Sequence, residues 1–158
     1  MARGKKPLLE NIEIKKIAAE GKSIAYVDEK VLFVPNTVPG DIVDVQVTRK
    51  RKSFLEGFIV NVRKYSDIRT EPFCSHFGVC GGCKWQNLPY QLQTEFKQQE
   101  IVDNLQRIGK VELQNVSPII GSPKTTYYRN KLEYTFCNKR FLTREEIANG
   151  QDIDRTPA

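Results

Sequence analysis

The sequence predicts a mainly β chain with some α-helix: a small five-stranded barrel, a cysteine-rich loop, one amphipathic helix and the start of a further β domain. Three observations support this prediction. Short runs of alternating or β-branched residues fill residues 8–66. Three of the four cysteines lie between positions 74 and 83. Residues 89–108 have apolar side chains at helical spacing.

The composition points to an anionic partner and a reducing compartment. The 158 residues carry a net charge of +6, which suits nucleic acid, although a basic surface with no partner would give the same value. No apolar run approaches the roughly 20 residues that span a membrane. The N-terminus lacks the apolar segment of a secretory signal. We therefore expect a cytoplasmic protein, no membrane association and reduced cysteines, which favours metal ligation over disulfides.

Residues 1–7 form a short basic tail, and residues 8–66 are expected to form the barrel. Asp28-Glu29 lies between two β-rich runs, which indicates a hairpin. Five short strands in about sixty residues are typical of the small barrels that bind oligonucleotides. The five expected strands lie around Ile12 and Ile14, at 23–27, at 30–34, around Val43, Val45 and Val47, and at 54–62.

The last hairpin of the barrel carries a basic tip. Phosphate oxygens are attracted to such a group of cations, and binding releases counterions. Alternatively, the tip is a solvated turn that keeps an exposed strand pair soluble. Phe54 and Phe58 follow it and could stack on bases, but core packing is the expected role of Phe58. The four basic residues predicted to bind RNA here are Arg49, Lys50, Arg51 and Lys52.

Residues 67–88 hold the cysteine motif, in which Cys74, Cys80 and Cys83 have the spacing C-x5-C-x2-C. Three thiols this close can bind one metal centre, and the Gly-Gly pair before the last cysteine allows a tight backbone turn. A zinc site would need His76 as its fourth ligand, and the spacing matches zinc motifs poorly. An iron–sulfur cluster also prefers four thiolates, but the distant Cys137 is expected to be a free strand cysteine.

Residues 89–158 are expected to contain one helix and an incomplete central β domain. The helix would run from about Pro89 to Ile108, stop at Gly109 and pack beside the cysteine loop. Strands are expected at 116–120 and 127–137, and residues 140–158 are polar and aperiodic. The long strand at 127–137 has no partner strand after it, so the domain is expected to be cut short. The apolar face of the helix would consist of Leu92, Phe96, Ile101, Leu105 and Ile108.

The motif Cys74-x5-Cys80-Gly-Gly-Cys83-x2-Gln86, after a basic barrel and before Tyr128-Arg129-Asn130-Lys131, resembles the RNA uracil-C5 methyltransferases. The resemblance is strongest to the bacterial group that modifies 23S ribosomal RNA. It covers about residues 8–137, and the cysteine motif is its specific part. It implies that residues 8–66 form a TRAM domain. A [4Fe–4S] segment, a central β domain and a C-terminal S-adenosylmethionine domain follow in that family.

The resemblance implies that Cys74, Cys80 and Cys83 bind a [4Fe–4S] cluster whose fourth ligand lies outside this chain. Arg129 and Lys131 match a basic central strand near the RNA. The family's catalytic cysteine, its carboxylate base and its S-adenosylmethionine site belong to the C-terminal domain, so no catalytic or cofactor-binding residue is assigned here.

The expected function is therefore that of the RNA-binding, cluster-bearing front part of an enzyme that makes 5-methyluridine, with 23S rRNA as the expected substrate and a monomer as the expected state. Two alternatives remain open. One is a stand-alone RNA-binding module with structural zinc at Cys74, His76, Cys80 and Cys83. The other is a redox sensor without an RNA role.

Overall fold

The computed structural model describes residues 6–79, 81–128, 136–150 and 152–156. It divides into two compact units, Met1–Pro123 and Lys124–Ala158, which are described separately. In the described part of the chain, no helix is both long and apolar enough to cross a membrane.

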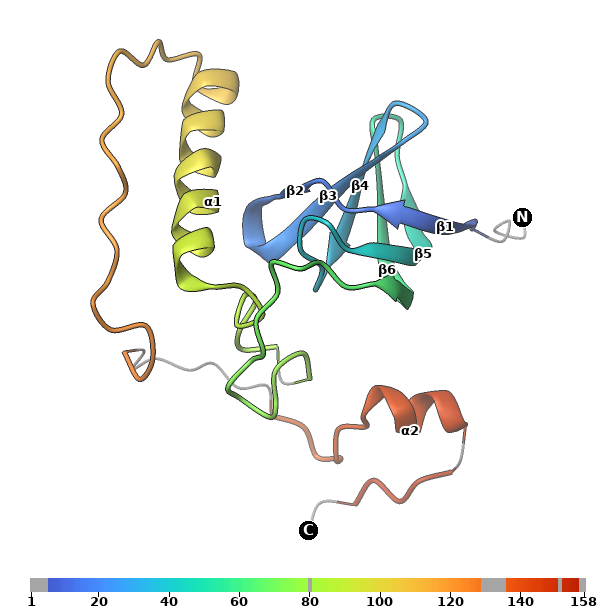
Figure 1. Ribbon diagram of the computed structural model, residues 1–158. Helices are drawn as coiled ribbons and strands as arrows, with labels where there is room; N and C mark the ends of the chain where they lie inside the picture. The colour runs from blue at the N-terminus through green and yellow to red at the C-terminus, as the bar shows by residue number, and fades with distance from the viewer. Residues whose placement is uncertain (1–5, 80, 129–135, 151, 157–158) are drawn as a thin grey trace. The chain divides into compact units, whose positions relative to one another are not determined.

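The first unit contains one six-stranded sheet, followed by a loop region and a long helix (Figure 1). The prediction of a mainly β chain with some helix is confirmed, but the sheet has six strands instead of five because a two-residue strand, β2, was missed. The strand order is β1-β5-β6-β4-β3-β2, and β4 and β6 form the parallel pair. The strands are β1 (Leu8–Glu13), β2 (Lys16–Ile17), β3 (Lys22–Val27), β4 (Lys30–Pro35), β5 (Ile42–Lys50) and β6 (Phe54–Lys64).

The sheet is curved because its two outermost strands are neighbours in the chain. β1 and β2 lie at opposite ends of the strand order, yet only Ile14 and Lys15 separate them. The Ile14 N–H donates to the Asp41 carbonyl beside β5 at 2.9 Å, and the Lys15 N–H donates to the Ile24 carbonyl of β3 at 2.8 Å. Two successive residues thus form hydrogen bonds near opposite ends of the strand order, which brings these ends together and curls the sheet toward a barrel.

Alternating side chains fill the inside of this curved sheet. On β5, Val43, Val45 and Val47 are buried, as their period of two predicts. Each such burial contributes roughly 1.5–3 kcal/mol relative to an exposed side chain. The buried core cluster consists of Ile14, Ala25, Leu32, Val34, Val43, Val45, Val47 and Leu55.

Asp44 departs from the alternation, because it lies between buried valines and is itself only 4% exposed. Its carboxylate accepts the Asn11 N–H at 3.0 Å and the Arg63 Nε–H at 2.7 Å. The Asn11 hydrogen bond, followed by those of Arg63 and Asn61, holds the pKa of Asp44 below its usual value. Asn11 has a positive φ of 53°, within a register shift of β1. Asp44 therefore anchors a bulge in the strand that closes the sheet.

The predicted hairpin at Asp28-Glu29 is confirmed. Val27 and Lys30 pair directly, so the connection has two residues. Both Asp28 and Glu29 have positive φ, at 47° and 62°, as in the type I′ turns that match the twist of paired strands.

The predicted helix is confirmed as α1 (Tyr90–Asp103), which continues through a π-helical turn (Asn104–Ile108) to Gly109. Its expected apolar face is covered only in part. Leu92 and Phe96 are half-buried, whereas Ile101, Leu105 and Ile108 are 59%, 40% and 79% exposed. The strand predicted at 116–120 is wrong: this segment has no regular structure. The side chain of Gln98 holds it instead, donating to the Ser117 carbonyl and accepting the Ile119 N–H.

The second unit contains a short helix, α2 (Arg144–Asn149), where we expected aperiodic chain. Thr143 and Glu146 form a capping box at its start, and Gly150 ends it with φ of 61°. The helix could have been predicted from these three residues, which give its start and its end. The predicted strand at 127–137 lies mostly at 129–135, outside the described residues, and its ends at 127–128 and 136–137 are not strand.

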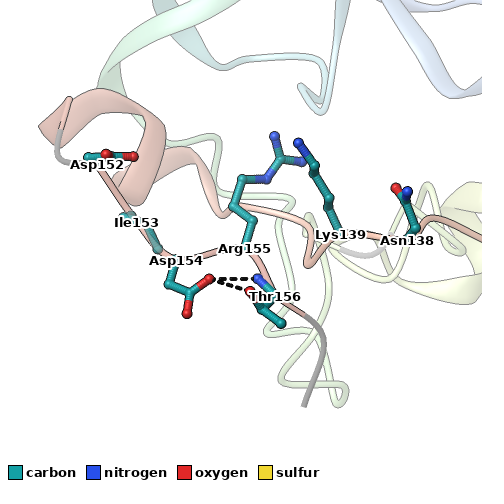
Figure 2. A pocket seen from close by; sticks show the side chains of 7 residues that line it. All are labelled: Asn138, Lys139, Asp152, Ile153, Asp154, Arg155 and Thr156. Atoms are coloured by element: carbon teal, nitrogen blue, oxygen red, sulfur yellow. Dashed lines mark hydrogen bonds between the residues drawn. The ribbon is translucent and has the colours of Figure 1, made fainter.

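Figure 2 shows a hollow in the second unit, lined by Asn138, Lys139 and residues 152–156. The Asp154 carboxylate accepts hydrogen bonds from both the N–H and the hydroxyl of Thr156, which lower the pKa of Asp154. Among the described residues, none of the predicted site residues lines this hollow.

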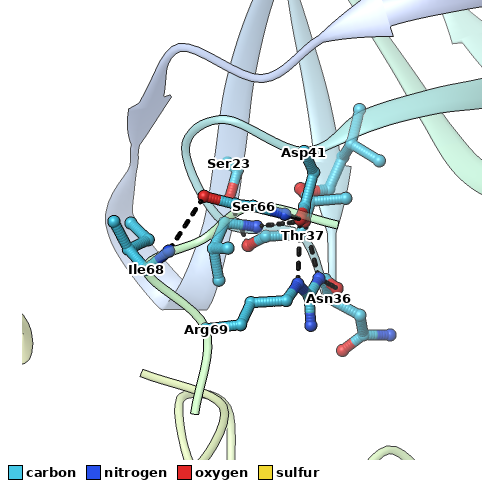
Figure 3. A network of polar contacts seen from close by, with 9 residues as sticks. Ser23, Asn36, Thr37, Asp41, Ser66, Ile68 and Arg69 are labelled. Carbon is cyan, nitrogen blue, oxygen red and sulfur yellow. Dashed lines mark hydrogen bonds and ion pairs between the residues drawn. The ribbon is translucent and has the colours of Figure 1, made fainter. Parts of the chain in front are cut away.

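A buried carboxylate, Asp41, ties the end of the barrel to the chain that follows it (Figure 3). Asp41 is 0% exposed. It accepts the Val38 N–H at 2.8 Å and the Ser66 N–H at 3.0 Å. Arg69 donates to both carboxylate oxygens, from Nε at 2.8 Å and from Nη2 at 2.6 Å. This paired geometry fixes residues 66–69 against the end of the barrel.

Replacing Arg69 with leucine should destabilise the fold by about 3–5 kcal/mol, because it leaves a buried carboxylate without its cation. Chemical denaturation measures this as the change in the free energy of unfolding. Arg63→Leu is the matched control, since Arg63 also pairs with a buried aspartate but is itself about half exposed. An equal decrease in the free energy of unfolding for the two variants would contradict the special role of the Asp41–Arg69 pair.

Candidate nucleic-acid interface and metal loop

The predicted basic tip lies at the turn between β5 and β6. Arg49, Lys50, Arg51 and Lys52 are all exposed. The Arg51 N–H donates to the Phe54 carbonyl at 2.9 Å, which closes the turn. Arg49 lies 3.5 Å from Glu56, a weak exposed ion pair that leaves the tip strongly basic. The four cations can therefore approach a phosphate backbone from solvent.

The two phenylalanines of β6 have different surroundings. Phe54 is half-buried and packs edge-on against Phe33, with ring centroids 5.9 Å apart. Phe58 is 45% exposed, so the expectation that it packs in the core is wrong. The predicted strand is present, but Leu55, Gly57 and Ile59 take its inward positions.

Phe58 lies in a row across the outer face of the sheet. Gln46 of β5 is its direct partner, and Leu8 of β1 is the partner of Gln46 on the other side. Arg49 lies three residues further along β5, about 10 Å at the rise of a strand. An exposed ring within reach of cations is the arrangement with which small barrels stack the bases of single strands.

In the cysteine loop, the side chain of Gln86 contacts the first and the last cysteine of the motif. Its Oε1 accepts the Cys74 N–H at 3.2 Å, and its Nε2 donates to the Cys83 sulfur at 3.2 Å. Cys74 is half-buried and Cys83 is exposed. Gly81 has φ of 73°, as expected for a tight turn before Cys83. Cys80 lies outside the described residues.

The described side chains fit a thiolate-bound group in part. Iron–sulfur clusters and zinc prefer soft thiolate ligands. Gln86 connects two of the cysteines that could supply such ligands. Among the described residues, no three His, Cys, Asp or Glu side chains form a metal-binding group. His76 is exposed, and its Nδ1 lies 3.3 Å from the Ser75 hydroxyl.

The cysteine loop is packed against the barrel at the 3-10 turn Ala19–Gly21. A Cβ on Gly21 would lie 2.6 Å from the Cβ of Lys84 and 3.4 Å from Nε1 of Trp85, and Gly21 has φ of 72°. Glycine is therefore required by both contact and backbone conformation. The close approach places the residues directly after Cys83 on the barrel surface.

Helix α1 holds the same segment from its other side. Gln93 donates to the Trp85 carbonyl at 3.0 Å and to the Leu88 carbonyl at 2.8 Å. The Lys97 ammonium lies 5.7 Å from the centre of the Trp85 ring, within cation–π range. These contacts agree with the expectation that the helix packs beside the cysteine loop.

The remaining predicted positions contribute little to this geometry. Arg129 and Lys131 lie outside the described residues. Cys137 is a free, exposed cysteine in the second unit. The Asp41–Arg69 pair was not predicted. No local signal exists for it, since the two residues are far apart in the chain.

Residues 10–60 match the TRAM domain family. Over 142 residues the chain is 54% identical to an uncharacterized RNA methyltransferase of Bacteroides thetaiotaomicron, covering 90% of this chain and 31% of the relative. A second uncharacterized RNA methyltransferase, from Porphyromonas gingivalis, is 50% identical over 143 residues, covering 90% of this chain and 30% of that relative. The 23S rRNA (uracil(1939)-C(5))-methyltransferase RlmD of Acidithiobacillus ferrooxidans is 42% identical over 118 residues, covering 75% and 27%.

The chain thus spans less than a third of the length of these curated relatives. Among solved structures, it is similar to Pyrococcus abyssi tRNA (uracil-54, C5)-methyltransferase in complex with S-adenosyl-L-homocysteine. That similarity has 25% identity and a TM-score of 0.42, and it covers 72% of this chain and 24% of the other. The predicted TRAM domain is confirmed. The predicted resemblance to RNA uracil-C5 methyltransferases agrees with the names of these relatives, of which the chain covers the smaller part.

Proposed function

We propose that this chain, a TRAM-containing relative of the RNA uracil-C5 methyltransferases, is the RNA-binding and iron–sulfur part of an S-adenosylmethionine-dependent enzyme that makes 5-methyluridine in 23S rRNA. The observation that carries the proposal is an exposed basic tip on a TRAM barrel, in a chain 54% identical to a protein named RNA methyltransferase. Methyl transfer and S-adenosylmethionine binding would belong to a C-terminal domain outside this chain. We place the enzyme in the cytoplasm as a monomer.

In this proposal, each successive segment of the chain has its own role. Residues 8–66 would bind RNA, and residues 67–88 would hold a [4Fe–4S] cluster through Cys74, Cys80 and Cys83. Such a cluster would order the loop by joining its thiolates. Residues 89–158 would begin the central β domain, where Arg129 and Lys131 would approach RNA. The fourth ligand would lie outside this chain.

A second candidate, structural zinc at the same loop, is separated from the first by metal analysis. Anaerobic reconstitution of the chain with iron and sulfide should give bound iron, bound sulfide and a brown absorption band. His76→Ala and Cys137→Ser should retain them, while Cys83→Ser should lose them. Bound zinc with loss on His76→Ala would support the zinc site instead, and binding of neither metal would contradict both.

Neutralising the tip should weaken the salt dependence of RNA binding. For Arg51→Gln with Lys52→Gln, we expect the slope of log K against log salt to fall by about 1.4, which is 0.7 for each phosphate that is no longer neutralised. Fluorescence anisotropy with a single-stranded RNA at several salt concentrations measures this. The matched control is Lys15→Gln with Lys16→Gln, two exposed cations elsewhere on the barrel. An unchanged slope in the tip variant would leave the tip as a solvated turn, and no RNA affinity even at low salt would favour a redox role.

Phe58→Ala should weaken RNA binding by about 1–3 kcal/mol because a base can no longer stack on the ring, with little change in the salt slope. Tyr26→Ala is the control, because Tyr26 is 56% exposed on β3 and outside the row across β1, β5 and β6. The same titration measures both variants, and their melting temperatures exclude a folding defect. Equal losses of affinity in the two variants would show that Phe58 has no specific role.

A further inference from the structure

We infer that Gln86 is a positioning residue that holds Cys74 and Cys83 together for ligation. This inference rests on the proposed cluster-binding role of the cysteine loop. It assigns to Gln86 one accepted hydrogen bond, from the Cys74 N–H, and one donated hydrogen bond, to the Cys83 sulfur, both at 3.2 Å.

The backbone on both sides of Gln86 is fixed by other contacts. The Asn87 carbonyl accepts the Thr70 N–H at 3.0 Å, and Asn87 is 3% exposed. Trp85 packs on Gly21 and accepts a hydrogen bond from Gln93. The Gln86 side chain therefore extends from an anchored backbone to the two turns that carry Cys74 and Cys83. The barrel and α1 fix the backbone at Trp85, and the Gln86 amide in turn fixes Cys74 and Cys83 relative to that backbone.

The chemistry of the contacts requires an amide. A carboxamide offers an acceptor and a donor at once, whereas the glutamate of the same shape keeps the acceptor and loses the donor. Glutamate would also place a negative charge beside the Cys83 thiolate. An N–H donor to a thiolate stabilises the negative sulfur, and hydrogen bonds to ligand sulfurs are among the factors that set a cluster's reduction potential. Gln86 is thus suited to orient Cys74 and Cys83 and to stabilise negative charge on the Cys83 sulfur.

The positioning role can be measured on the full chain without metal. Amide hydrogen exchange at Cys74, followed by NMR under reducing conditions, should speed up about fivefold in Gln86→Leu, the effect of removing one hydrogen bond. Gln86→Glu keeps the acceptor and should exchange like the wild type. Gln91→Leu, on the exposed side of α1, is the control for loss of a surface glutamine. Unchanged exchange in Gln86→Leu would overturn the inference.

The ligand role is measured on the chain reconstituted with iron and sulfide. Gln86→Leu and Gln86→Glu should both lose iron to a chelator about tenfold faster than the wild type, the usual cost of removing a hydrogen bond to a metal ligand. Both should also have a more negative midpoint potential, and Gln91→Leu should match the wild type. Wild-type rates and potentials in both Gln86 variants would contradict the role. If the wild type takes up no iron, the proposed cluster fails, and Cys74 exchange still decides the positioning of the loop.

Discussion

The Asp41–Arg69 ion pair is the interaction on which the arrangement of the first unit depends. Asp41 is fully buried, so its charge is tolerated only because two backbone N–H groups and the fork of Arg69 satisfy its oxygens. Its own carbonyl accepts the Ile14 N–H, at the point where the chain crosses from β1 to β2. One residue therefore connects the closure of the curved sheet with the exit of the chain toward the cysteine loop.

This connection explains how a small barrel can hold the base of the cysteine loop in a defined place. Arg69 is followed at once by Thr70, whose N–H bonds the Asn87 carbonyl and so brings the two ends of the loop together. Gly21 admits Trp85 to the barrel surface, and Gln93 holds Trp85 from the helix. The loop is thus fixed at its base by hydrogen bonds and packing that involve none of its cysteines.

Local signals in the sequence predicted the local structure. The alternation of Val43, Val45 and Val47 and the turn at Asp28-Glu29 depend on neighbouring residues alone, and both predictions are confirmed. Phe58 was predicted wrongly because hydrophobicity does not say which face of a strand is covered, and here Leu55, Gly57 and Ile59 point inward. The Asp41–Arg69 pair could not be predicted, since its partners are distant in sequence and meet only once the sheet has curled.

The two parts of the candidate site, the basic tip and the cysteine loop, differ in how far local sequence predicts them. RNA binding at the basic tip would need exposed positive charge at a hairpin turn. Two strand patterns separated by four cations predict such a turn from the local sequence alone. Thiolate ligation needs several cysteines within a few ångströms, and spacing alone does not fix their geometry. Here the base of the loop is already closed between Thr70 and Asn87, and Gln86 joins two of the cysteines. Because the base of the loop is already closed, a bound group would have to close a shorter length of chain, which lowers the entropic cost of assembling its ligands.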